Sequence, residues 1–203
     1  MLTITIILFI CGVFVPLAIN KNSRIVNMLG VGSILGLSAK TIYQTIMNYL
    51  AQDGFLITSF FQIPIIILGI AGAFHSIGYL RGHWEHRRGL YWALYFLTIF
   101  GMLSVIEKFC LMSILGILLA WEMMSLASAG LVGFDTHSKQ TQRAFWTYLL
   151  ASNAGAAFIM LMFAATPDRP ILWIIFMIIG FGLKVGFPIL HVWLPQAHPA
   201  APA

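Results

Sequence analysis

The chain has 203 residues, of which 60% are hydrophobic and only 8% are charged. A soluble globular domain carries about 25% charged residues because its surface must be hydrated, so this composition excludes a soluble domain and indicates a lipid environment. The formal net charge of +5 does not indicate a nucleic-acid-binding protein, because the basic residues are scattered between apolar runs. Cys11 and Cys110 both lie in apolar segments, which favours buried thiols over a disulfide framework, a metal site or an iron–sulfur cluster.

Seven apolar segments follow one another along the chain, each close to the roughly 20 residues that a helix needs to cross a bilayer core. They are residues 2–19, 25–46, 56–79, 90–106, 109–134, 144–165 and 171–193. The first is expected to be a retained span rather than a signal peptide, because no basic residue precedes it and no cleavage site comes before Lys21. No linker or repeat divides the chain. The sequence therefore predicts an all-α polytopic transmembrane helix bundle of about seven helices, forming a single transmembrane domain over residues 1–203.

The basic residues between the segments predict the orientation. Cytoplasmic loops of membrane proteins carry an excess of lysine and arginine. With the N-terminus outside, the outer loops hold Lys108 and Arg169, and the inner loops hold Lys21, Arg24, Arg81, Arg87, Arg88, Lys139 and Arg143. We therefore expect a multi-pass protein of the inner (cytoplasmic) membrane, with its N-terminus outside and its C-terminus cytoplasmic. The tryptophans near span ends fit an interfacial belt; they are Trp84, Trp92, Trp146 and Trp193.

Polar residues in the first half of the chain have structural explanations. Lys40 lies in the polar end of the second segment, where a lysine can extend its ammonium to the membrane interface. His75 and Tyr79 share one helix face near a span end, and a structural role is favoured there. His83 and His86 lie among three arginines, whose charges oppose a bound cation, so no metal site is expected.

Glu122 lies midway through the fifth segment, with mostly apolar residues on either side. A charge at the bilayer centre costs roughly 2.5–3.5 kcal/mol on insertion scales, and so short a side chain cannot reach the interface. The following residues up to Gly130 are rich in small side chains, which permit close helix packing. Glu122 is thus expected to face other helices, either as a functional carboxylate or as a neutral, hydrogen-bonded structural group.

Lys184 is the second unexplained charge, and it lies between Gly182 and Gly186, four residues apart, which predict a small-residue packing face. Pro188 would leave the carbonyl of Lys184 without its helical partner, and Pro195 would do the same to His191. This pattern predicts a broken helix between Lys184 and Pro195. Such a break in mid-membrane is typical of ion sites, although a pure packing kink is the alternative.

Two histidines follow Lys184 on this segment, His191 and His198. Histidine titrates near physiological pH and suits a proton relay, but either residue could equally be structural. No motif for a flavin, nicotinamide, haem or iron–sulfur cofactor is present, so no catalytic redox residue is expected in this chain.

Two stretches carry a resemblance to a known family. The run from Trp121 to Leu126, WEMMSL, resembles the glutamate-bearing helix of the antiporter-like subunits of respiratory complex I. The run from Gly180 to Pro202, GFGLKVGFPILHVWLPQAHPAAP, is similar to the family's broken lysine helix, and its ending resembles the hydrogenase-4 and formate-hydrogenlyase branch in particular. The run from His75 to Tyr79 fits the family's third span more weakly.

The resemblance implies that Glu122 and Lys184 form a charge pair whose separation is coupled to proton movement, with His191 and His198 as relay residues. The chain departs from the family in three ways. Pro188 stands one residue earlier than the family's proline, the polar insertion before the lysine helix is short, and the family continues past the last residue into further helices. The last departure leads us to expect a split or truncated subunit, or one completed by another chain.

The function implied is a proton-translocating membrane subunit of a complex I-like redox complex, of hydrogenase-4, formate hydrogenlyase or NADH-quinone oxidoreductase type. Electron transfer would belong to partner subunits, membrane and peripheral. The alternatives are a component of a multi-subunit Mrp-type cation/proton antiporter or of a bicarbonate-accumulating complex, and an inactive structural fragment.

Overall fold

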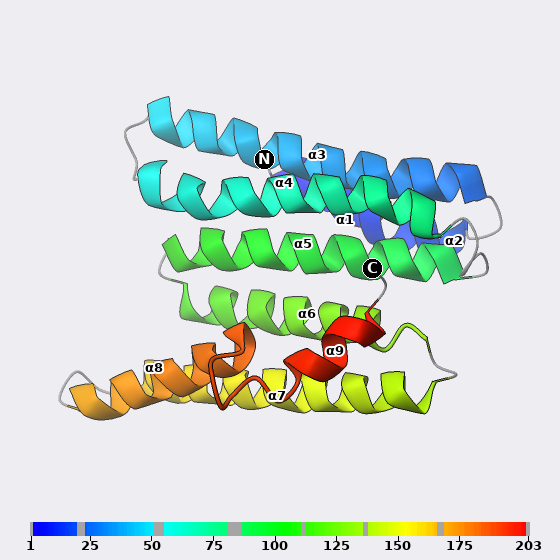
Figure 1. The fold of residues 1–203 in the computed structure, drawn as a ribbon. Helices are drawn as coiled ribbons and strands as arrows, with labels where there is room; N and C mark the ends of the chain where they lie inside the picture. Colours follow the sequence, from blue (N-terminus) through cyan, green and yellow to red (C-terminus); the bar gives the residue numbers. More distant parts are fainter. Residues whose placement is uncertain are drawn as a thin grey trace. The chain divides into compact units, whose positions relative to one another are not determined.

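The computed structural model describes residues 2–19, 23–50, 55–80, 87–110, 113–135, 138–165 and 169–201, without the side chains of 2, 55–59 and 108–110. Every regular element within these residues is a helix, as the sequence predicted. The helices fall into two compact units, one reaching to Ser113 and the other from Ile114 to Pro202. Figure 1 shows the helices of both units.

The first unit begins with a segment that changes its helical pitch. Helix α1 (Leu2–Phe9) continues into a π-helical turn, η1 (Ile10–Phe14), and then into α2 (Val15–Ala18). Pro16 follows this turn and has no N–H to offer the carbonyl of Gly12, four residues earlier. Gly12 lies directly against the ring of Phe96, where a Cβ atom would come within 2.5 Å. The wider π turn thus accommodates both the proline and a close approach to α5.

Helices α3 (Ser23–Leu50), α4 (Phe55–Tyr79) and α5 (Arg88–Cys110) pack against one another and complete the first unit. Trp92 of α5 is fully buried, lies against Gly30 of α3, and donates its indole N–H to Asn27 Oδ1 at 3.0 Å. Ser76 of α4 shares a hydrogen bond of 2.7 Å with the Tyr91 hydroxyl of α5. Small residues and buried hydroxyl pairs therefore hold these helices together, as is typical of membrane interfaces.

The second unit contains α6 (Ile114–Val132), α7 (Lys139–Ala164), α8 (Pro170–Val185) and α9 (Leu194–Ala200). Ser138 caps α7, accepting the N–H of Thr141 at 3.4 Å. Helices α7 and α8 lie side by side (Figure 1). Their closest approach is at Gly155 and Gly180, where a Cβ on either glycine would lie within about 3.1 Å of the other's carbonyl oxygen.

The helix break predicted after Lys184 is confirmed, but it is caused by a glycine and not by the prolines from which it was predicted. Gly186 adopts the left-handed conformation with φ +79° and caps α8, and the N–H of Phe187 bonds the Gly182 carbonyl at 2.9 Å. Gly186 is thus a helix cap, and Gly182 packs against Leu190 and Phe187 within the break, so the two glycines do not form the predicted packing face.

Pro195 begins a helix and does not interrupt one. It stands in the first turn of α9, where a missing N–H is harmless. The carbonyl of His191 accepts the N–H of Leu194 at 2.9 Å, so the prediction that this carbonyl loses its partner was wrong. Ile189, in the turns before α9, has a positive φ of 77° and is 91% exposed.

Five of the described helices are long and apolar enough to cross a membrane, and two shorter apolar helices, Thr3–Ala18 and Pro170–Val185, accompany them. These correspond to the seven predicted segments. Large apolar side chains such as Leu68, Leu115 and Ile171 are about 70% exposed on the outer helix faces, where lipid would solvate them. The chain is a multi-pass membrane protein. The single domain over residues 1–203 stays a prediction.

Candidate functional site

The ammonium of Lys184 lies inside the second unit, where two hydroxyl groups hold it. Lys184 stands in the last turn of α8, just before Gly186, so the negative end of the helix dipole favours its positive charge. Its Nζ donates to Ser125 Oγ of α6 at 2.9 Å and to Tyr148 Oη of α7 at 3.0 Å. Nζ lies 5.1 Å from the centroid of the Tyr148 ring, so the hydroxyl is the nearer group.

The two hydroxyls belong to a longer chain of polar groups. Tyr148 Oη also shares a hydrogen bond of 2.7 Å with Ser128 Oγ, which in turn donates to the Met124 carbonyl at 2.8 Å. Ser125 and Tyr148 are buried, and both lie well inside their apolar helices. We call Lys184, Ser125, Tyr148 and Ser128 the hydroxyl cluster.

The residues after the helix break fold back and hold the cluster in place. Trp193 donates its indole N–H to the carbonyl of Leu183 at 2.6 Å, and its ring contacts the ring of Tyr148 edge-on with centroids 4.9 Å apart. Tyr148 also packs in a core with Ala129, Val132, Ala144 and Ala197. Tyr148 is thereby fixed from one side by α9 and from the other by α6, so its hydroxyl presents a fixed partner to Lys184.

The hydroxyl cluster suits a lysine that changes its protonation state. An ammonium has three N–H donors and no acceptor, whereas a hydroxyl can both donate and accept. Both hydroxyl oxygens accept from the charged amine in the structure, and the Tyr148 hydroxyl can turn to donate to a neutral amine. A buried group of this kind can therefore keep its hydrogen bonds before and after a proton leaves.

Glu122 lies on α6 one turn before Ser125, and its side chain is half-buried. Residues three apart on a helix have Cβ atoms about 5–6 Å from each other, so Glu122 lies one turn along α6 from the hydroxyl that holds the ammonium. No ion pair within 4.0 Å joins Glu122 to Lys184 in the part of the chain that the structure describes, where the observed ion pair is Lys40–Glu107. The charge pair of Glu122 and Lys184 stays a prediction.

The two candidate relay histidines do not join the hydroxyl cluster. His191 is exposed, and its Nδ1 lies 3.4 Å from the Phe187 carbonyl. His198 is exposed on α9. His83 and His86 lie outside the described residues. Elsewhere along the described ranges, no three His, Cys, Asp or Glu side chains gather closely enough to hold a metal ion.

Sequence reasoning missed Tyr148 and gave the two serines a role in packing alone. The signal for Tyr148 is periodic, because the buried residues of α7 recur every three to four positions through Ala144, Tyr148, Ser152 and Gly155. Tyr148 is the hydroxyl with the longest reach on that buried face. The partners of Lys184 depend on how α6, α7 and α8 pack, which periodicity alone does not give.

Two basic residues have tertiary contacts that the sequence did not predict. The side chain of Lys40 is only 12% exposed, and its Nζ lies 3.8 Å from Glu107 Oε2. Arg88, counted among the loop charges, is 4% exposed and donates to the Leu80 carbonyl beyond the end of α4 at 2.9 Å. Both tertiary contacts join residues far enough apart in sequence that local context could not predict them. Lys21 and Arg81 lie outside the described residues.

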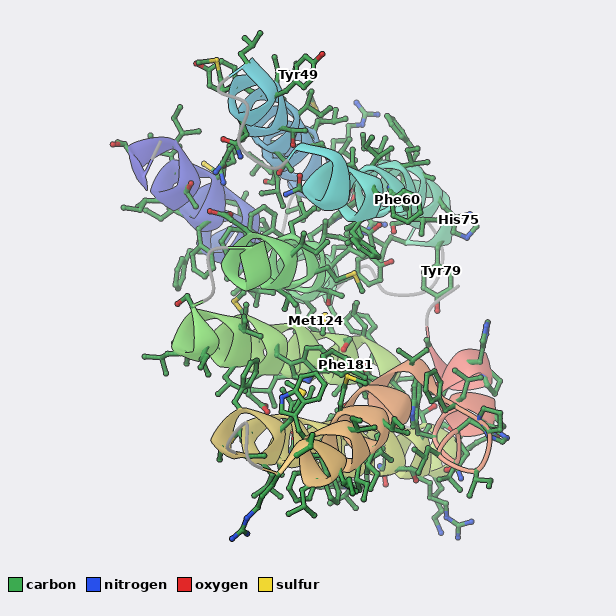
Figure 2. The ribbon with its side chains drawn as sticks, turned by 90° about the vertical axis from the view of Figure 1, so that its left-hand side faces the viewer. Tyr49, Phe60, His75, Tyr79, Met124 and Phe181 are labelled. Carbon is green, nitrogen blue, oxygen red and sulfur yellow. The ribbon has the colours of Figure 1, made fainter. Side chains whose placement is uncertain are left out.

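Figure 2 labels residues from both units. Phe181 lies between α6 and α8, with its ring edge-on to Trp121 at 5.5 Å between centroids. The contact stands one helical turn from the bond between Lys184 and Ser125, and it helps to fix α8 against α6. His75 is exposed on α4, as suits the structural role favoured for it.

Comparison with known proteins gives the family resemblance independently of these contacts. No family model matches the chain. Hydrogenase-4 component B of Escherichia coli is 27% identical over 165 residues, which are 72% of this chain and 24% of that protein. NADH-quinone oxidoreductase subunit N of Desulforudis audaxviator is 27% identical over 162 residues, which are 70% of this chain and 31% of that protein. The chain is therefore similar to antiporter-like membrane subunits.

An uncharacterized protein of Mycobacterium tuberculosis is 33% identical over 145 residues, 64% of this chain and 22% of that protein. The chain thus spans between about a quarter and a third of the length of the curated relatives it matches. The resemblance predicted from the two motifs is confirmed for this part of the subunit.

Proposed function

We propose that the chain is part of a proton-translocating membrane subunit of a complex I-like redox complex, in which Lys184 takes up and releases the transported proton. The observation that carries the proposal is the position of the Lys184 ammonium, held by the hydroxyls of Ser125 and Tyr148 one helical turn from Glu122. Intramembrane charges are costly and usually serve a function, and the names of the relatives support a place in a redox complex.

Proton transfer at the site would depend on two positions of the Lys184 ammonium. Held by Ser125 and Tyr148, the lysine has only neutral hydroxyl partners, which can both accept and donate and so can hold the amine with or without its proton. Paired with Glu122, one turn away, the lysine keeps its proton because an opposite charge stabilises the ammonium. Movement of the side chain between the two positions would thus alternate proton uptake and release.

The later steps involve residues that the hydroxyl cluster does not contain. His191 and His198 follow the helix break and are exposed, so they are placed to pass a proton between Lys184 and groups of another segment or chain. Partner subunits would supply the electron transfer. We place the protein in the cytoplasmic membrane, with its N-terminus outside, on the basis of the basic loop residues.

Charge-removing variants in the assembled complex test the proposal. Lys184→Met and Glu122→Gln should each abolish coupled proton transfer, followed with a pH-sensitive dye in native membrane vesicles. Lys139→Met is the matched control, because Lys139 is an exposed lysine at the start of α7 and its loss should leave transfer intact. Parental transfer by both Lys184→Met and Glu122→Gln would show that these residues are structural.

A further inference from the structure

The first unit contains a polar cavity of about 240 Å³ that is separate from the hydroxyl cluster. Helices α3 and α5 contribute its charged residues, Lys40 and Glu107. Polar side chains continue the wall, namely Thr5, Thr41, Gln44, Gln62 and Ser104. An empty cavity in a protein is normally apolar, whereas a polar one holds water. At about 30 Å³ per water molecule, the space is enough for roughly eight.

Lys40 and Glu107 form a loose pair across this cavity. Their charged atoms are 3.8 Å apart, and their side chains are 12% and 32% exposed. This separation is longer than the roughly 2.7–2.9 Å of a strong charge-assisted hydrogen bond. Of the described residues that line the cavity, from α1, α3, α4 and α5, these two are the titratable ones.

An aromatic layer lies on one side of the cavity. Phe100 lines the cavity and stacks on Phe96 at 5.9 Å between centroids, and Phe9 of α1 contacts the rings of both. Phe96 is 1% exposed. Such a dry layer excludes water. Glu107 lies two turns after Phe100 on α5, toward the end of that helix at Cys110.

We propose that this cavity is a hydrated proton-exchange site open to one side of the membrane, in which Glu107 binds and releases a proton and Lys40 is its counter-charge. The proton passes from cavity water to a carboxylate oxygen of Glu107 and returns by the same path, so no other reactant is needed. The aromatic layer stops it from continuing through the unit. The proposal does not depend on transport through Lys184, because all the groups involved belong to the first unit.

Cysteine accessibility tests the water and its sidedness without disturbing the charge pair. In a chain with Cys11 and Cys110 replaced by serine, Thr41→Cys and Ser104→Cys place thiols in the cavity wall. The matched controls are Ser38→Cys on α3 and Thr98→Cys on α5, whose hydroxyls bond the carbonyls four residues earlier as Thr41 does. A charged methanethiosulfonate reagent reacts with the hydrated thiolate.

The cavity thiols should react at least about tenfold faster than the controls, because thiolate formation requires water. In sealed vesicles of defined orientation, this labelling should occur from one side of the membrane. Cavity thiols that react no faster than Ser38→Cys and Thr98→Cys, or that react equally from both sides, would overturn the proposal.

Infrared difference spectroscopy of the reconstituted full chain tests the proton itself. Acidification should produce a protonated-carboxyl band that Glu107→Gln removes and Glu122→Gln retains. Lys40→Met should move the appearance of this band to higher pH, because the Glu107 carboxylate loses the opposite charge that favours its ionised form. A band that is unchanged in Glu107→Gln, or in Lys40→Met, would refute the assignment. Coupled transfer by Lys184 is a separate measurement, so failure of either proposal is distinguishable from failure of the other.

Discussion

Replacing Tyr148 with phenylalanine removes one oxygen atom from the hydroxyl cluster and leaves the packing of its ring unchanged. The lost oxygen accepts from Lys184 Nζ at 3.0 Å and shares a hydrogen bond with Ser128 Oγ. Ser128 keeps its bonds to the Met124 and Ser125 carbonyls, so the donor that loses an acceptor is the Lys184 ammonium. The ring contact with Trp193 at 4.9 Å remains. The substitution therefore acts mainly on the position of the ammonium.

The size of the effect follows from that single bond. A hydrogen bond to a charged group contributes about 1.5–3 kcal/mol, and each 1.4 kcal/mol changes an equilibrium about tenfold. Tyr148→Phe should thus disfavour the cluster-held position of Lys184 by about tenfold to 150-fold relative to pairing with Glu122. If both positions are needed in each cycle, coupled proton transfer should fall by about tenfold or more.

Native gels and a pH-sensitive dye applied to the same membranes separate assembly from transfer. Assembly should be parental, since the aromatic contacts persist. Tyr43→Phe is the matched control, because its side chain is 54% exposed on α3 of the first unit. Transfer by Tyr148→Phe at the rate of Tyr43→Phe would refute the reasoning that the hydroxyl helps to position the transported proton.

Three further predictions concern the charges, the helix contacts and the topology. The double variant Glu122→Gln/Lys184→Met should assemble better than either single variant, because removing one partner of a buried pair costs about 3–5 kcal/mol. The double variant should nevertheless be inactive in proton transfer. Equal assembly of all three variants on native gels would argue against pairing. Gly180→Val should lower the Tm, because a Cβ at Gly180 would lie 2.8 Å from Ile159 and overpacking costs about 1–3 kcal/mol. Gly32→Ala, with no neighbour within 4 Å, is its control, and equal melting temperatures would contradict the close contact. Reporter fusions at Arg87 and Lys139 should both be cytoplasmic, and an external signal at either would reverse the orientation.

The sequence predicted the helices well because apolar segments of membrane length have few alternative structures. Their ends were less accurate: α7 begins at Lys139, five residues before the predicted start at Ala144, since the polar residues of its first turn are outside the apolar pattern. The break after Lys184 was predicted from prolines, whereas the positive φ of Gly186 makes it. A glycine in a cap and a glycine in a packing face look alike in a sequence.

The candidate site was only partly predictable. Lys184 and Glu122 were identified because a charge stands out in an apolar segment, but the hydroxyls that hold Lys184 come from α6 and α7, and hydroxyl residues are common in membrane helices. The partner of Lys40 was missed for a related reason. Its neighbours on α3 are polar, whereas its partner Glu107 lies 67 positions later on α5, and no local pattern relates the two.

The contact between Gly155 and Gly180 has a mechanical consequence for Lys184. The two backbones come close at these glycines, with the side chains of Ile159 and Leu183 packed beside them, and this contact is a pivot about which α8 could tilt. Lys184 lies four residues beyond Gly180, which is about 6 Å along the helix axis. A tilt of α8 by about 20° about the Gly155–Gly180 contact would displace the Lys184 backbone by roughly 2 Å. Rotation of the Lys184 side chain would add to this displacement. Gly155 and Gly180 thus connect the tilt of α8 to the distance between Lys184 and Glu122.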